Sequence, residues 1–321
     1  MRSKVYQLEK QMLTSFLSRK RIGLLLRVFS PKSDLKDQTV EQILDVLARA
    51  HQVRLEGQLL FSRIDVLVSA DDRYGDTDCG GTAKAVRDHL EEEIREEYRW
   101  QQEHDSIATS EKIKIVIREV KNGDIFCGML NYGVAKQMRD RIDYTMILSI
   151  GAREYLTAKN MEAMLLALAA GAKVTGLAIT ELAPSIMEGR IANTCAIWDN
   201  IDLMTVGGFD LRAAKALKDD RLVDYVRGWS EEKGEVFYAA SGVEEIIPLV
   251  RMIKLFGACI APIMPLTGAR WEVSKDPDVQ KREQSKLGTK YERQMRWVVA
   301  ENVDFSFIRG GVVKVSPSLS K

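Results

Sequence analysis

Two hydrophobic patterns alternate along the chain. The segments Ile22–Phe29 and Ile64–Ser69 are almost continuously apolar, which is typical of strands buried on both faces of a parallel sheet. Thr39–Val53 instead repeats its apolar positions every three or four residues, which predicts an amphipathic helix. The alternation continues with strands predicted at Lys114–Arg118, Tyr144–Ile150 and Lys173–Ile179, and helices at Ala83–Gln102, Met129–Arg139 and Asn160–Ala170.

This order predicts an α/β fold built from strand–helix–strand units, with a mostly parallel sheet and helices on both of its faces. A polar amphipathic helix, residues 1–21, precedes the first strand. Ligands of such sheets gather beyond the carboxyl ends of the strands. We therefore expect a cleft lined by the polar loops Ser30–Asp34, Ala70–Thr82 and Ile150–Glu154.

Composition narrows the class of protein. The 321 residues are 45% hydrophobic and 29% charged, which is the balance of a soluble globular protein. The formal net charge of +1 gives no global field for polyanions, so we expect no nucleic-acid binding.

Four widely separated cysteines contain no zinc-type pair and indicate a reducing compartment, so we expect a cytoplasmic protein. The most apolar helical run, Met161–Ala172, is too short to span a bilayer, and the first residues lack the apolar region of a signal peptide.

The order of the segments resembles the GT-A fold, a Rossmann-like fold, of the family 2 glycosyltransferases. Five segments carry the resemblance: VFSPKSD, DVLVSADDRYGDTDCGGT, EVKNGDIFCGMLNYGVAKQM, LMTVGGFD and SGVEEIIPLVR. The resemblance implies a glycosyltransferase domain at 22–265, with a nucleotide-binding half at 22–180 and an acceptor half at 181–265. A charged C-terminal extension, 266–321, then follows, and its charge suits a lid over the nucleotide, a surface that docks against a partner or a solvated helix.

The resemblance implies a UDP- or GDP-sugar donor. It assigns contacts with the nucleotide to residues after the first and second strands and in the LNYG helix. Asp71 and Asp72 also suit a turn or a helix cap, and Gly133 also suits close contact between a helix and a strand. The residues with an implied nucleotide role are Ser30, Pro31, Asp71, Asp72, Asn131, Gly133 and Lys136.

The sequence departs from the family at the fourth strand, where members carry an Asp-x-Asp that binds Mg²⁺ or Mn²⁺. The matching region holds Ser149, Gly151, Arg153 and Glu154, so the two hard anionic ligands are missing. Three interpretations stay open. Arg153 or another cation stabilises the diphosphate without a metal, a metal binds elsewhere with Glu154 as a ligand, or catalysis has been lost.

The pair Glu244–Glu245 matches the family segment that supplies the catalytic base. An inverting transferase needs one carboxylate to accept the proton of the attacking hydroxyl. The alternative is structural: Ser241 and Glu244 fit an S-x-x-E capping box at a helix start, although Pro248 counts against that helix.

The resemblance also implies an acceptor region around the GGF segment, with Trp198, Asp199, Gly207 and Gly208 as its candidates. Trp198 suits a sugar-stacking surface or a core position. The predicted function is transfer of a sugar from a nucleotide-sugar to a carbohydrate or other hydroxyl acceptor. The alternatives are a catalytically inactive binding or structural subunit, including a homo-oligomer, and a sugar nucleotidyltransferase.

Overall fold

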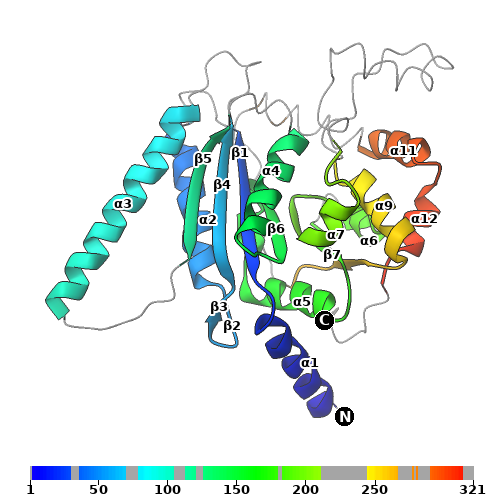
Figure 1. Ribbon diagram of the computed structural model, residues 1–321, viewed down its shortest axis with the longest axis horizontal. Coiled ribbons are helices and arrows are strands. Elements are labelled where there is room, and N and C mark those ends of the chain that lie inside the picture. Colours follow the sequence, from blue (N-terminus) through cyan, green and yellow to red (C-terminus); the bar gives the residue numbers. More distant parts are fainter. Residues whose placement is uncertain are drawn as a thin grey trace.

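The computed structural model describes ten parts of the chain: residues 2–29, 36–69, 79–104, 113–120, 126–179, 183–210, 244–266, 277, 280 and 290–313. Within them, the predicted α/β class is confirmed: a central seven-stranded sheet is flanked by helices (Figure 1). No helix in these parts is both long enough and apolar enough to cross a membrane.

The sheet has the strand order β5-β4-β1-β6-β8-β7-β9. Every neighbouring pair is parallel except those that involve β8, which runs antiparallel to both β6 and β7. A separate two-stranded hairpin, β2 and β3, precedes β4. The strands are β1 Ile22–Phe29, β2 Arg54–Leu55, β3 Gln58–Leu59, β4 Phe61–Ser69, β5 Lys114–Val120, β6 Tyr144–Ser149, β7 Val174–Leu177, β8 Cys195–Asp199 and β9 Ile260–Ile263.

Helices cover both faces of the sheet because successive strand residues point to opposite sides. On β1, Leu24 and Leu26 join one core with α1, α2, α3 and α5, whereas Leu25 joins a second core with α4, α6, α7, α9, α11 and α12. The helices on the first face are α1 Arg2–Leu17, α2 Lys36–Gln52, α3 Cys79–His104 and α5 Ala158–Ala169. Those on the second are α4 Phe126–Arg139, α6 Ala183–Met187, α7 Asn200–Thr205, α9 Ile246–Phe256, α11 Lys290–Ala300 and α12 Phe305–Gly310.

The structure adds strands that the hydrophobic pattern did not predict. β8 and β9 are short, are buried except for Asp199 at the end of β8, and lie between segments assigned to loops or helices. The predicted halves 22–180 and 181–265 both contribute strands to this one sheet.

A buried polar network joins α4 to the sheet. The Arg63 guanidinium is 3% exposed and donates two hydrogen bonds of 2.6 Å to the Asp65 carboxylate. Gln137 donates to Asp65 and to the Leu24 carbonyl, at 3.1 and 3.0 Å, and accepts a bond from Thr145. Arg63 also bonds Asp140, so every member of this network is partnered.

The C-terminal extension contributes to the body of the fold. Trp297 and Val298 of α11 and Ile308 of α12 are buried in the same core as α9. Arg190 packs against both of these helices. Its guanidinium lies 4.4 Å from the ring centroid of Phe305 and 5.4 Å from that of Tyr291.

Candidate functional site

The strand order locates a candidate ligand site. The chain moves from β1 to β4 and β5 on one side, and then crosses to β6 on the other side of β1. Such a reversal opens a crevice between the carboxyl ends of the two strands, where open α/β sheets bind ligands. Arg27 of β1 lies in register with Ser149 of β6 at this place. In Figure 1 these carboxyl ends are at the top of the sheet.

Arg27 faces the start of α9. Its Nη1 atom lies 3.9 Å from Oε1 of Glu244, and the two side chains are 19% and 6% exposed. Burial lowers the pKa of Arg27 to about 10, against the opposing effect of the Glu244 charge. The other carboxylate oxygen of Glu244 is buried and has no hydrogen-bond partner among the described residues. The predicted candidate Glu244 is thus paired with a cation at the place where the strand order of the sheet reverses.

Glu245 is buried beside a second cation. Nζ of Lys290, the first residue of α11, lies 3.3 Å from its Oε1 atom in a charge contact without hydrogen-bond alignment. Burial raises the pKa of Glu245 to about 7; Lys290 opposes the rise and the Glu244 charge adds to it. Near neutral pH this carboxyl group exchanges protons, which is the property a general base needs.

The helix that follows these glutamates begins later than a capping box requires. α9 starts at Ile246, with Glu245 as its N-cap residue and no side-chain capping bond. Glu244 therefore precedes the helix instead of lying in its first turn, and Ser241, the other residue of the predicted S-x-x-E box, lies outside the described residues. Pro248 lies in the first turn, where the missing N–H costs nothing, so its expected conflict with the helix does not arise.

Asn131 holds the GGF turn. Its side-chain amide donates to the Phe209 carbonyl and accepts from the Phe209 N–H, both at 2.8 Å. Gly208 has a φ of +69°, and a Cβ added there would lie 2.5 Å from the Asn131 Oδ1 atom. Arg251 of α9 donates to the Val206 carbonyl at 3.4 Å, so the turn is held from two helices.

This contact yields a stability prediction. Gly208→Ala must accept a left-handed backbone and displace Asn131, and we expect it to lower the free energy of unfolding by about 2 to 4 kcal/mol. Gly171→Ala is the matched control, because Gly171 has a φ of +104° and no atom within 4 Å of an added Cβ. Urea titration should show a smaller loss for Gly171→Ala; equal losses would contradict the importance of the Asn131 contact.

The other nucleotide candidates of α4 lie inside the helix, which starts three residues earlier than predicted. Gly133 packs on β1, where an added Cβ would lie 2.6 Å from the Leu25 side chain. Its backbone amide is too far from the helix start to be available to a phosphate. Lys136 is partly exposed and its Nζ atom lies 5.2 Å from the Tyr132 ring centroid.

The region of the missing Asp-x-Asp forms the end of β6 and a short 3-10 helix, η3, Ile150–Tyr155. Ser149 and Gly151 supply no charge. The Arg153 guanidinium bonds Asp45 of α2 at 2.9 Å, and Glu154 is exposed. Within the described parts of the chain, no three His, Cys, Asp or Glu side chains converge on a metal position. These residues do not fit a divalent ion, so no step of the chemistry is assigned to one.

Trp198 and Asp199 lie beside the amino end of β6, at the opposite end of that strand from Ser149. β8 runs against β6, and Asp199 pairs with Tyr144 at the amino end of β6. Trp198 is fully buried, donates to Asn193 at 2.8 Å and packs edge-on against Phe209. Asp199 caps α7 by accepting from the Asp202 N–H. Trp198 is a core residue here, with no ring face exposed to a sugar.

Four predicted nucleotide residues, Ser30, Pro31, Asp71 and Asp72, lie outside the described residues. The structure in turn identifies two site residues that the sequence analysis did not, Arg27 and Lys290. A charged residue inside the apolar run of β1 was the available signal for Arg27, because buried strands rarely contain an arginine without a partner.

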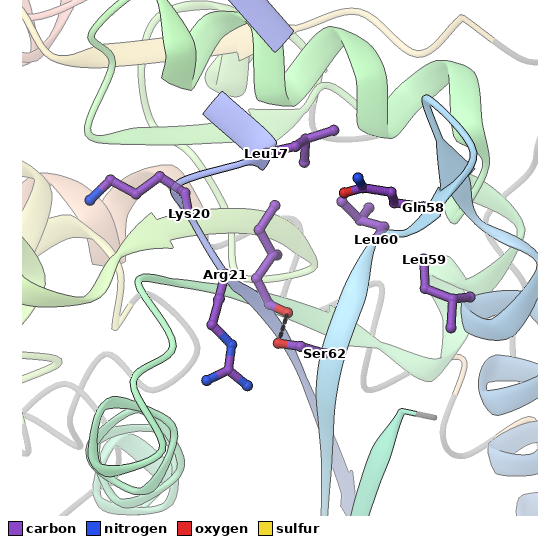
Figure 2. A pocket seen from close by; sticks show the side chains of 8 residues that line it. Leu17, Lys20, Arg21, Gln58, Leu59, Leu60 and Ser62 are labelled. Carbon is purple, nitrogen blue, oxygen red and sulfur yellow. Dashed lines mark hydrogen bonds between the residues drawn. The ribbon is translucent and has the colours of Figure 1, made fainter. Parts of the chain in front are cut away.

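A cavity of about 130 Å³ lies at the opposite, amino edge of the sheet (Figure 2). It is smaller than most small-molecule sites. Lys20 and Arg21 line it from the link between α1 and β1, and Ser62, which also lines it, donates to the Ile22 carbonyl at 3.4 Å. Its place at the amino edge separates it from Arg27 and Glu244.

No protein-family model and no curated protein matches the sequence. Among solved structures, the chain is similar to the glucosyl-3-phosphoglycerate synthase of M. tuberculosis, with 12% identity over 95% of this chain and 86% of that one, and a TM-score of 0.39. It is also similar to a cytidylyltransferase from Leptospira borgpetersenii serovar Hardjo-bovis, with 11% identity over 92% of this chain and 100% of that one, and a TM-score of 0.38. Likeness at this level does not decide between functions.

Proposed function

We propose that the protein is a GT-A-type glycosyltransferase, similar to family 2, which transfers a sugar from a UDP- or GDP-sugar to a hydroxyl acceptor without a divalent metal. One observation carries the proposal: two buried glutamates, Glu244 and Glu245, lie beside Arg27 at the point where the strand order reverses. Ligands of α/β sheets bind at that point.

The chemistry follows from the charges. Glu245 accepts the proton of the acceptor hydroxyl while the hydroxyl oxygen bonds the anomeric carbon. The bond from that carbon to the diphosphate oxygen breaks, and the electron pair leaves with the diphosphate. Glu245, whose pKa is raised to about 7, is suited to this proton transfer. Arg27 supplies positive charge to the departing diphosphate, and Glu244 orients Arg27.

The remaining predicted contacts complete the proposal. Asp71 and Asp72 recognise the base and ribose of the nucleotide, and Ser30 and Pro31 border it. The turn at Gly207–Gly208 borders the acceptor, since Asn131 of α4 holds it.

A second candidate, a non-catalytic relative acting as a binding or structural subunit, is favoured by other observations. Both glutamates are almost fully buried, at 4% and 1% exposure, which limits the access of an acceptor hydroxyl. Arg153 is engaged by Asp45, so it is not available to a diphosphate. This candidate predicts self-association, measurable by light scattering, and no donor turnover.

Isothermal titration with UDP, GDP and their sugars, each with and without Mn²⁺, tests the proposal. We expect binding of at least one nucleotide-sugar, with an affinity that Mn²⁺ leaves unchanged. Slow hydrolysis of that donor, followed by nucleotide release, would show catalysis. A third arm supplies a nucleoside triphosphate and a sugar 1-phosphate. Pyrophosphate release there would identify a sugar nucleotidyltransferase instead, and the absence of any nucleotide binding would exclude both enzymes.

A further inference from the structure

Three side chains form a cluster on the α4 side of the sheet. Cζ of Arg118, from β5, lies 5.9 Å from the Tyr132 ring centroid, and Nζ of Lys136 lies 5.2 Å from the same centroid. Tyr132 and Lys136 belong to α4, one turn apart. The Tyr132 side chain is 41% exposed, so the cluster opens to solvent.

The two cations of this cluster, unlike the cations near them, form no ion pair with a carboxylate of the described residues. Nearby cations have carboxylate partners: Arg87 bonds Glu119 at 2.9 Å and Lys114 bonds Asp140 at 2.5 Å. Among the described residues, no carboxylate forms an ion pair with Arg118 or Lys136. Nε of Arg118 is also buried and finds no hydrogen-bond partner in the described parts of the chain. A buried donor of this kind is costly unless a ligand satisfies it.

The sheet register relates the cluster to the candidate site. Arg118 of β5 lies opposite Leu67 of β4, and Leu67 lies opposite Arg27 of β1. The three residues share one face, and two strand spacings of about 4.8 Å each separate the Cα atoms of the two arginines. Both arginines are close to the carboxyl ends of their strands. Leu67, between them, is fully buried, so a ligand shared by Arg27 and the cluster has to pass over the carboxyl ends of the strands.

We propose that Arg118, Tyr132 and Lys136 form a phosphate-binding subsite. Arg118 presents its planar fork to two phosphate oxygens, Lys136 adds a point charge, and the Tyr132 hydroxyl donates a further hydrogen bond. The inference rests on the proposed function, because it assigns a phosphate contact to residues near the same carboxyl ends of the strands. The phosphate comes either from the nucleotide diphosphate or from a phosphorylated acceptor, and the experiment separates these sources.

The test compares the wild type with R118Q, K136Q and the double variant by isothermal titration at low salt. The probes are inorganic pyrophosphate, UDP, uridine and glycerol 3-phosphate. Lys159→Gln is the matched control, because it removes the same charge from the exposed side of α5, on the other face of the sheet. Thermal unfolding of each variant verifies the fold. Y132F separates the hydroxyl from the ring.

We expect the double variant to bind phosphate-bearing probes at least about tenfold more weakly, with uridine and the Lys159→Gln control unchanged. A loss confined to UDP and pyrophosphate identifies the nucleotide as the source, and a loss confined to glycerol 3-phosphate identifies a phosphorylated acceptor. Phosphate binding that survives both substitutions, or that is absent from the wild type, overturns the inference.

The two proposals fail separately. If no nucleotide binds but glycerol 3-phosphate or pyrophosphate still depends on Arg118 and Lys136, the proposed transferase fails and the subsite stands. If UDP binds and every phosphate-bearing probe binds equally well to the wild type and to the double variant, the subsite fails and the nucleotide proposal stands.

Discussion

Glu245→Gln is expected to abolish sugar transfer and, at alkaline pH, to stabilise the protein. Glutamine keeps the shape of the side chain but cannot accept the hydroxyl proton, so turnover should fall by about 10²- to 10⁴-fold. The same change removes a charge that is costly to bury, because Glu245 is 1% exposed. A residue that only supported the fold would not produce this combination.

The sign of the pH effect follows from the pKa of Glu245, about 7 in the folded protein against an ordinary value of 4.5. Between these values the folded state holds a proton that the unfolded state has lost. The contribution of the Glu245 carboxyl group to the free energy of unfolding is therefore fully present below pH 4.5, and it is lost as the pH rises through 7. We expect the stability of Glu245→Gln to exceed that of the wild type by on the order of 2 to 3 kcal/mol at pH 8.5, and the two to converge near pH 4.

Urea titrations at both pH values and donor turnover provide the measurements, with Glu162→Gln, an exposed change on α5, as the control. Lys290→Gln is a companion variant. It removes the cation that opposes the rise of the Glu245 pKa, so the midpoint of the turnover profile should move to higher pH, and Lys290→Arg should restore it. Full turnover by Glu245→Gln would exclude this residue as the base.

Arg63→Met is expected to lower the free energy of unfolding by about 3 to 5 kcal/mol, because the buried Asp65 carboxylate then lacks its bidentate partner. A loss of this size is a large part of the stability of an ordinary domain. Urea unfolding monitored by circular dichroism measures it.

Arg87→Met is the matched control for this prediction. It breaks an ion pair with Glu119 in which both side chains are more than a third exposed, and such pairs contribute about 1 kcal/mol or less. Adding Asp65→Leu to Arg63→Met should recover part of the loss, since no unpaired charge remains. Equal effects of Arg63→Met and Arg87→Met would show that burial of the pair is unimportant.

The hydrophobic pattern predicted the long buried strands and helices well. It missed strands, or parts of strands, whose polar or proline residues are accommodated only by contacts with residues far away in the sequence. β1 was predicted to its last residue because all of its residues except Arg27 are apolar or glycine. β4 begins three residues earlier than predicted because Arg63 looks like the polar end of a strand until Asp65 is placed beside it on the same face. β9 was missed because Pro262 argues against a strand interior.

The candidate site shows the same division. Glu244 and Glu245 were identified from an ordered set of motifs, yet nothing local in the sequence relates them to Arg27 or Lys290. Trp198 followed the motif order in sequence, but β8 reverses direction and carries it to the opposite edge of the sheet. Direction of a short buried strand is set by its neighbours, so the acceptor prediction could not anticipate it.

The ion pairs at the carboxyl edge have a consequence for the order of folding. Arg27 and Glu244 are separated by more than two hundred residues, and Lys290 is made later still. During synthesis, β1, β4, β5 and β6 can associate while Arg27 still lacks Glu244. Glu245 meets its cation only when α11 leaves the ribosome. The charges of the site therefore gain their partners only after most of the chain has been made.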